Sequence, residues 1–209
     1  MIHKSRIQKR VEIFFVVFTL VFNGISLYAQ NQLDDNFKKN ADKYYNIEYQ
    51  IPINYHGIKV EHFPLYFSVE KHIRSSFDHG IKNDKLNIVV TFSLLIAKPL
   101  ETPRSKHARE ILGDLSVINP KEIINQADIT LSKIKYLDTL QLNKVNAESG
   151  VIYNLKINIK YMGIYARCKK IELYKDNVGR VEILFFYNKK DDALVDKEIE
   201  KTWGMLKFK

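Results

Sequence analysis

The sequence predicts an α+β domain in which helices pack on an antiparallel sheet. Apolar residues alternate with polar ones along several short segments, as they do in half-buried strands. Helical periodicity occurs in only a few segments, and these do not alternate regularly with the strands, which argues against a parallel sheet. The chain has 209 residues, of which 45% are hydrophobic and 27% charged, so it is neither a disordered chain nor a multi-span membrane protein.

The first 29 residues have the pattern of a secretory signal peptide. Basic residues between Lys4 and Arg10 precede an apolar run at 13–22, and Ala29 supplies a small residue before the expected cut. The run is too short for a membrane span, which needs about 17–25 apolar residues. We therefore expect cleavage after Ala29, a periplasmic or secreted product, and no transmembrane anchor after cleavage. An uncleaved anchor is the alternative.

The remaining chain is expected to form a single α+β domain at 44–209, preceded by a linker or weak helix at 30–43. The segment from Leu86 to Ala97 is apolar on both faces, so we expect it to be the central strand, covered on both sides. The other elements expected in this half are strands at 45–51, 58–63 and 65–69, a turn-rich loop at 71–84 and a charged loop at 98–107.

The second half predicts one helix, a three-strand meander and a final helix. Asn119 is a suitable N-cap, with Pro120 in the first turn and Glu122 three residues after the cap, so a helix is expected to run to about Lys135. Strands are expected at 151–161, 163–174 and 180–187, with a hairpin turn at 176–179. The apolar seam of the final helix comprises Val195, Ile199, Trp203 and Leu206, and Gly204 is expected to end it.

The order of these elements is shared with a known family. The shared features are the helix from Asn119–Pro120, the strand opening at 150–153, the strand at 169–174, the Gly179 hairpin and the closing helix with its 203–208 end. With these features, residues 115–209 resemble the PsbP-like fold of the extrinsic PsbP subunit of photosystem II and of DcrB-type bacterial envelope proteins. The resemblance implies an α-β-α sandwich and an exported, non-catalytic binding or assembly accessory.

Charge and composition narrow the class of partner. Thirty-three Lys and Arg residues against 24 Asp and Glu give a net charge of +9. Without residues 1–29, 29 basic and 23 acidic residues remain. This net charge of +6 fits either a lysine-rich solvated surface or attraction to an anionic envelope surface or partner. An exported chain without an arginine-rich stripe fits nucleic acid poorly, so the expected partner is an envelope protein or a small ligand. No cofactor is expected.

No arrangement of residues predicts a catalytic or metal site. Ser75 and Ser76 lie near histidines but lack a nucleophile elbow. Cys168 is interpreted as a buried, inert thiol. Glu172 and Glu182 lie on neighbouring strands and are interpreted as solvent-face residues paired with lysines rather than as glycosidase acids. The histidines of the remaining chain match no metal-ligand spacing; they are His56, His62, His72, His79 and His107.

The polar face of the meander is the remaining candidate for a binding surface, because Tyr and Arg often anchor partner surfaces. The alternative is a solvated sheet face, or one that helices cover. The sequence thus favours an exported, non-catalytic binding or accessory protein of the bacterial cell envelope; a small envelope hydrolase that uses the 71–84 loop and an immunity-type inhibitor of an exported toxin are the alternatives. The candidate binding residues are Lys156, Lys160, Tyr161, Tyr165, Arg167, Lys169 and Arg180.

Overall fold

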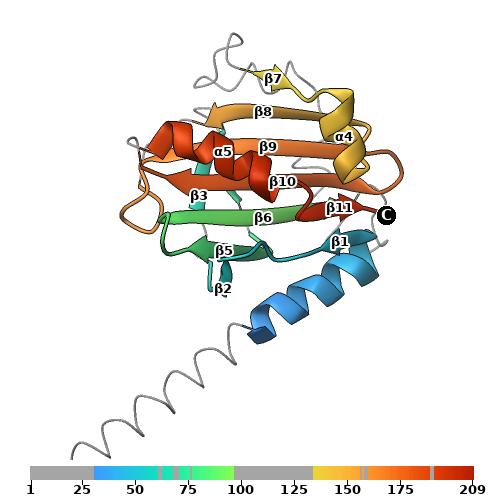
Figure 1. The fold of residues 1–209 in the computed structure, drawn as a ribbon, viewed down its shortest axis with the longest axis horizontal. Coiled ribbons are helices and arrows are strands. Elements are labelled where there is room, and N and C mark those ends of the chain that lie inside the picture. The colour runs from blue at the N-terminus through green and yellow to red at the C-terminus, as the bar shows by residue number, and fades with distance from the viewer. Residues whose placement is uncertain are drawn as a thin grey trace, which may run out of the picture.

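The structure is a computed structural model, shown in Figure 1. It describes residues 31–60, 63–67, 71–75, 77–96, 134–155, 157, 160–188 and 191–209. The expected signal peptide at 1–29, the expected loop at 98–107 and nearly all of the helix expected from Asn119 lie outside the described residues, as do His62, Ser76, His107 and Lys156.

A seven-stranded sheet forms the centre of the molecule (Figure 1). Every pair of neighbouring strands is antiparallel, which confirms the α+β class with an antiparallel sheet. The strands, in spatial order, are β2 (His56–Ile58), β5 (His79–Asn83), β6 (Ile88–Ile96), β10 (Gly179–Tyr187), β9 (Arg167–Lys175), β8 (Ser149–Leu155) and β7 (Lys135–Tyr136).

Strand β6 lies inside the sheet, between β5 and β10. Val89 and Val90 point to opposite faces and both are fully buried, which confirms that this segment is covered on both sides. The middle strand of the seven is β10, which turns back from β9 through residues 176–178, as the hairpin prediction requires. Asn177 in this turn has a positive φ of 57°, a conformation that Asn adopts more readily than most residues.

Three helices are described, and all pack on the same face of the sheet. They are residues 31–45, α4 (Thr139–Val145) and α5 (Asp192–Thr202). Phe37, Val145, Val195 and Ile199 bring these helices into one apolar core with alternate residues of β9, β10 and β6. Figure 1 shows α4 and α5 lying across the near side of the sheet. None of the helices in the described parts of the chain has the length and apolar character of a membrane span.

The two faces of the meander carry separate apolar clusters. Val181, Ile183 and Phe185 of β10 pack with the helices, whereas Leu184 and Phe186 belong to a second cluster on the opposite face. This division confirms the predicted alternation, which follows from the two-residue period of a strand. The strand expected at 151–161 is shorter than predicted and ends at Leu155.

Two small two-stranded sheets complete the described fold. Strand β1 (Ile47–Tyr49) pairs with β11 (Leu206–Phe208), and β3 (Phe63–Phe67) pairs with β4 (Lys71–Ser75). The first pair joins the two ends of the described chain, because Ile47 lies opposite Phe208. The Asn146 side chain donates a hydrogen bond to the Phe208 carbonyl at 3.0 Å, which fixes α4 against the same strand.

Further sequence predictions need correction. Residues 71–84 are not a turn-rich loop, because they contain β4 and β5. Lys135, expected at the end of a helix, lies in strand β7 instead. Residues 139–145, between the expected helix and the meander, where no element was predicted, form α4, which begins with a capping box between Asp138 and Gln141. Leu206, assigned to the seam of the final helix, lies in β11, and α5 ends before Trp203.

Candidate functional site

A group of charged side chains is buried on the face of the meander opposite the helices. Glu172 of β9 and Glu182 of β10 are direct cross-strand neighbours. Lys170 Nζ lies 2.9 Å from Glu172 Oε1 and 3.1 Å from Glu182 Oε2. Arg180 Nη2 lies 2.9 Å from Glu182 Oε1, and the Tyr153 hydroxyl donates a 2.5 Å hydrogen bond to Glu172. We call these five residues the buried charge network.

The network corrects the expectation that Glu172 and Glu182 face solvent. Only 3% of Glu172 and 2% of Lys170 is exposed. Burial by itself raises the pKa of Glu172, but Lys170 and Arg180 outweigh it and hold this pKa below its ordinary value. Burial by itself lowers the pKa of Lys170, but Glu172 and Glu182 outweigh it and raise this pKa. Glu172 and Lys170 stay ionised because each has a partner of opposite charge, as buried ions require.

This arrangement does not have the chemistry of a glycosidase pair. Such an enzyme needs one carboxylic acid whose pKa is raised so that it can donate a proton. Here the pKa of Glu172 is lowered, and one lysine ammonium bridges both carboxylates. We therefore interpret the network as a structural element that fixes the register of β9 and β10.

The seven candidate residues do not gather on one surface. Lys156 lies outside the described residues, and Lys160 and Arg167 are exposed. Lys169 is on the helix-covered face, where its ammonium pairs with Asp196 of α5. Arg180 points to the opposite face and belongs to the buried charge network. Because side chains alternate along a strand, no single surface of the meander can present both.

The two tyrosines of that set are core residues. Tyr161 and Tyr165 are each only 1% exposed. The Tyr161 ring stacks on Phe186 with their centroids 4.0 Å apart, and the Tyr165 hydroxyl donates to Asn87 Oδ1 at 3.0 Å. Their role in the described fold is packing in the second apolar cluster.

A groove of about 470 Å³ lies on the other face, between α4 and α5. Its volume falls within the range of about 300–1,000 Å³ that is typical of ligand sites. Strands β8 and β9 contribute to it, and Trp203 borders it at the end of α5. The residues that line this α4–α5 groove are Lys135, Gln141, Lys144, Ile152, Tyr153, Asn154, Lys169, Asp196, Ile199, Glu200 and Trp203.

Charges of both signs line the groove. Lys135 of β7 and Lys144 of α4 are exposed and have no ion-pair partner among the described residues. Glu200 of α5 is also exposed, and its carboxylate is unpaired in the described part of the chain. The pair between Lys169 and Asp196 links the sheet to α5 within the groove. Only Lys169 of the groove was a candidate from the sequence.

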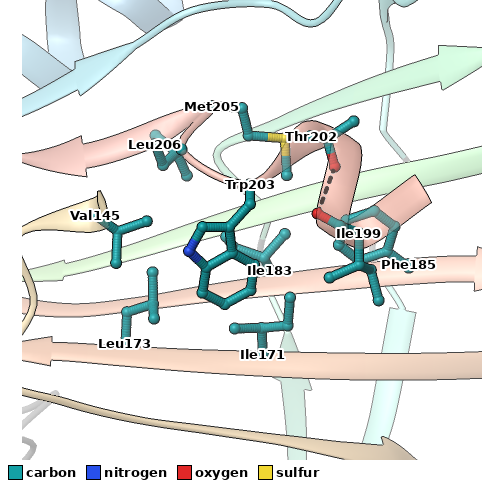
Figure 2. Close-up of a pocket in the computed structure, with 11 residues that line it drawn as sticks. Val145, Ile171, Leu173, Ile183, Phe185, Ile199, Thr202, Trp203, Met205 and Leu206 are labelled. Carbon is teal, nitrogen blue, oxygen red and sulfur yellow. Dashed lines mark hydrogen bonds between the residues drawn. The ribbon is translucent and has the colours of Figure 1, made fainter. Parts of the chain in front are cut away.

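Trp203 stands where three hollows meet. It borders the α4–α5 groove, a second hollow of about 300 Å³ beside the 50–53 turn, and a small apolar cavity beneath it. Figure 2 shows its indole lying over Ile171, Leu173 and Ile183, with Val145 of α4 alongside. Its ring N–H donates to the Gln141 carbonyl at 2.9 Å, so this side chain ties the end of α5 to α4.

The remaining sequence candidates occupy structural positions. His79 is buried, and its Nε2 lies 2.7 Å from Asp34 Oδ1 of the 31–45 helix. His56 Nδ1 lies 3.6 Å from Asp84 on the surface. Cys168 is buried as predicted, and burial raises the pKa of its thiol. Among the described residues, no group of three or more His, Cys, Asp or Glu side chains could hold a metal ion.

Comparison of the chain with protein-family models, with curated proteins and with solved structures finds no match.

Proposed function

We propose that this protein is an exported, non-catalytic binding protein of the bacterial cell envelope, and that it holds its ligand or partner in the α4–α5 groove. The groove is the observation that carries this proposal. It combines a ligand-sized volume, charged groups that have no ion-pair partner among the described residues, and an aromatic side chain, Trp203. In ligand sites, the polar and charged groups fix the orientation of the ligand and provide specificity.

The chemistry of the lining supports binding rather than turnover. A nucleophilic mechanism needs Ser, Cys or another activated nucleophile beside a base. None of the described residues that line the groove is Ser, Cys or His. The hydrolase alternative relied on residues 71–84, but His79 in this segment is buried against Asp34 and Phe37. These observations favour the binding protein over the hydrolase.

Export is supported by the sequence of the first 29 residues. A basic start, a ten-residue apolar run and Ala29 make up the pattern that secretory signal peptides share. N-terminal sequencing of the chain recovered from its own cells tests this part of the proposal. We expect the recovered chain to begin at Gln30, and a chain that retains Met1 or Ile2 at its start would contradict cleavage.

The PsbP-like resemblance of residues 115–209 supports the same functional class. Families with this fold include exported accessory proteins, and the antiparallel sheet with helices packed on it is compatible with such a fold. We therefore propose a PsbP-like arrangement for this chain. An experimental structure that places a helix layer on both faces of the sheet would support it, and an uncovered second face would contradict it.

Capture of envelope components by the tagged full chain tests the binding role. The groove variant carries Lys135→Glu and Lys144→Glu. The matched control carries Lys197→Glu and Lys207→Glu, which make the same charge change at exposed positions outside the groove. We expect the wild type and the control to retain the same component and the groove variant to lose it.

Three outcomes would contradict the proposal. Equal retention by all three chains would place binding outside the groove. A chain that retains nothing but hydrolyses an ester, glycoside or peptide substrate would favour the hydrolase. Retention of one exported toxin, with loss of the toxin's activity, would assign the immunity role instead.

A further inference from the structure

We infer that the α4–α5 groove binds a short peptide through its free amino and carboxyl termini. This inference rests on the proposed function, because it assigns a ligand class to the same site. Its basis is the distribution of charge in the groove. Lysines come from β7, α4 and β9, whereas both carboxylates, Asp196 and Glu200, come from α5.

The two signs of charge are separated by element. Lys135 and Lys144 stand on the β7 and α4 side, and Glu200 stands on α5 one turn after Asp196. Where a lysine and a carboxylate do meet, at Lys169 and Asp196, they pair directly. The pairing shows that oppositely charged groups of the floor and of α5 come within contact distance.

The charged groups that have no partner in the described part of the chain favour a ligand that carries both charges. A ligand that carries only negative charge would meet the lysines but would also approach Asp196 and Glu200. A ligand that carries only positive charge would be repelled by Lys135 and Lys144 in the same way. Repulsion of the wrong charge is a usual source of specificity. A zwitterion can place its carboxylate at the lysines and its ammonium at Glu200.

Part of the groove suits an uncharged, partly apolar segment of a ligand, because Ile152, Ile199 and Trp203 line it. The indole N–H of Trp203 is already bonded to the Gln141 carbonyl, so the ring offers mainly apolar surface to a ligand. The Asn154 amide has no hydrogen-bond partner among the described residues and can bond to a peptide group. Charged ends with an apolar and amide-bearing centre describe a short peptide.

The single tryptophan of the chain provides a direct test. Because Trp203 is the only Trp of the chain and lines the groove, intrinsic tryptophan emission reports on the surroundings of this one side chain. The purified full chain is titrated with Ala-X-Ala tripeptides, with X drawn from Leu, Phe, Val, Ser and Gln. We expect at least one free tripeptide to change the Trp203 emission saturably. Its N-acetylated and its C-amidated forms should each bind about tenfold more weakly or worse.

Variants of the groove identify which side chains bind the amino terminus and the carboxyl terminus of the peptide. In Glu200→Gln, acetylation of the peptide should no longer weaken binding, because the acceptor for the ammonium is gone. In Lys135→Gln with Lys144→Gln, amidation should no longer weaken binding. The control is Glu48→Gln with Lys207→Gln, an exposed cross-strand pair of β1 and β11, and it should behave as the wild type.

The outcomes separate this inference from the proposed function. If no tripeptide changes the emission, or if free and capped peptides bind equally, the peptide assignment is wrong. The binding role still stands in that case when capture of an envelope component depends on Lys135 and Lys144. If capture does not depend on these lysines, the proposed function fails independently of the peptide result.

Discussion

At the scale of the residue, two adjacent lysines of β9 have opposite environments. Lys169 points toward α5 and pairs with the exposed carboxylate of Asp196. Lys170 points to the other face, where it is 2% exposed and contacts both Glu172 and Glu182. A lysine therefore forms an ion pair with an exposed partner at position 169, whereas the lysine at position 170 lies at the centre of the buried charge network.

This contrast predicts very different costs for the same substitution. Lys170→Met should lower the free energy of unfolding by about 3–5 kcal/mol, because it leaves two buried carboxylates without their shared partner. Lys169→Met should cost about 0–1 kcal/mol, as is usual for ion pairs with an exposed member. Urea unfolding followed by circular dichroism measures both. Equal costs, or a Lys170→Met chain as stable as the wild type, would contradict the network's structural role.

At the scale of the element, one face of the 31–45 helix attaches to the sheet. Phe37 and Ala41 are buried in the core, and Asp34 lies one turn before Phe37. Asp34 Oδ1 lies 2.7 Å from His79 Nε2, and its Oδ2 accepts the Gly57 N–H at 3.1 Å. The His79 ring also stacks on Phe37, with centroids 4.5 Å apart. This helix therefore depends on a buried group that titrates.

The attachment predicts a loss of stability below neutral pH. Burial lowers the pKa of His79 below its ordinary value of 6.5, and Asp34 offsets part of this effect. Tyr49 is the other titratable group against the ring. Because the unfolded chain binds the proton more readily, the stability that neutral His79 contributes is present above pH 6.5 and is lost as the pH falls through that value.

Urea unfolding between pH 8 and pH 5.5 measures this dependence. The decline in the free energy of unfolding should be smaller in His79→Gln, which keeps an N–H donor for Asp34 but does not titrate. His56→Gln is the matched control, because His56 is paired with Asp84 at the surface, and it should leave the decline unchanged. A decline of the same size in His79→Gln would contradict the assignment to His79.

Trp203 links two elements, and its loss should affect both. It is only partly buried, so Trp203→Ala should cost less than the roughly 3–5 kcal/mol of a fully buried Trp. Trp203→Phe should cost about 0.5–1.5 kcal/mol, because it keeps most of the packing but loses the hydrogen bond to Gln141. Faster amide exchange in α4 should accompany both variants. An unchanged unfolding midpoint in Trp203→Ala would contradict this packing.

Elements with strong local signals were predictable from the sequence. The hairpin at 176–178 and helix α5 carry turn residues, an apolar seam and acidic residues at the helix start, and both were predicted. Helix α4 was missed because it has only seven residues, although Asp138 and Gln141 have the spacing of a capping box. Strand β5 was missed because His79, Gly80 and Lys82 resemble turn residues; its pairing partners supply the stability that its own sequence lacks.

The candidate site was harder to predict because it depends on tertiary structure. The sequence pointed to Lys169 but not to Lys135, Lys144 or Glu200, which come from three different elements. Charged residues in a strand were assigned to solvent, whereas the buried carboxylates of Glu172 and Glu182 pair with Lys170 and Arg180. Such cross-strand pairing depends on register, which a single strand does not specify.

At the scale of the whole molecule, the two ends of the described chain lie against each other. Strand β11 pairs with β1, and the Lys209 side chain binds the Asp42 carboxylate of the 31–45 helix. Leu206 and Phe208 are buried in the same core as Phe37. The C-terminal strand therefore holds the N-terminal helix in place.

Deletion of residues 206–209 should release this helix. Loss of β11 removes the partner of β1, two buried apolar side chains and the contact to Asp42. We expect faster hydrogen exchange in residues 31–49 and a lower unfolding midpoint, while amides of β9 and β10 keep their relative protection. Protection of 31–49 that is unchanged by the deletion would contradict this role of β11.

The binding role of the α4–α5 groove is the central claim, and Trp203 emission tests it most directly. The component captured from the envelope is returned to the purified wild type, to Lys135→Glu with Lys144→Glu, and to the control Lys197→Glu with Lys207→Glu. The account predicts a saturable change in emission for the wild type and the control, and a change at least tenfold weaker for the groove variant. Equal affinity of all three chains without a change in Trp203 emission would show that the protein binds elsewhere.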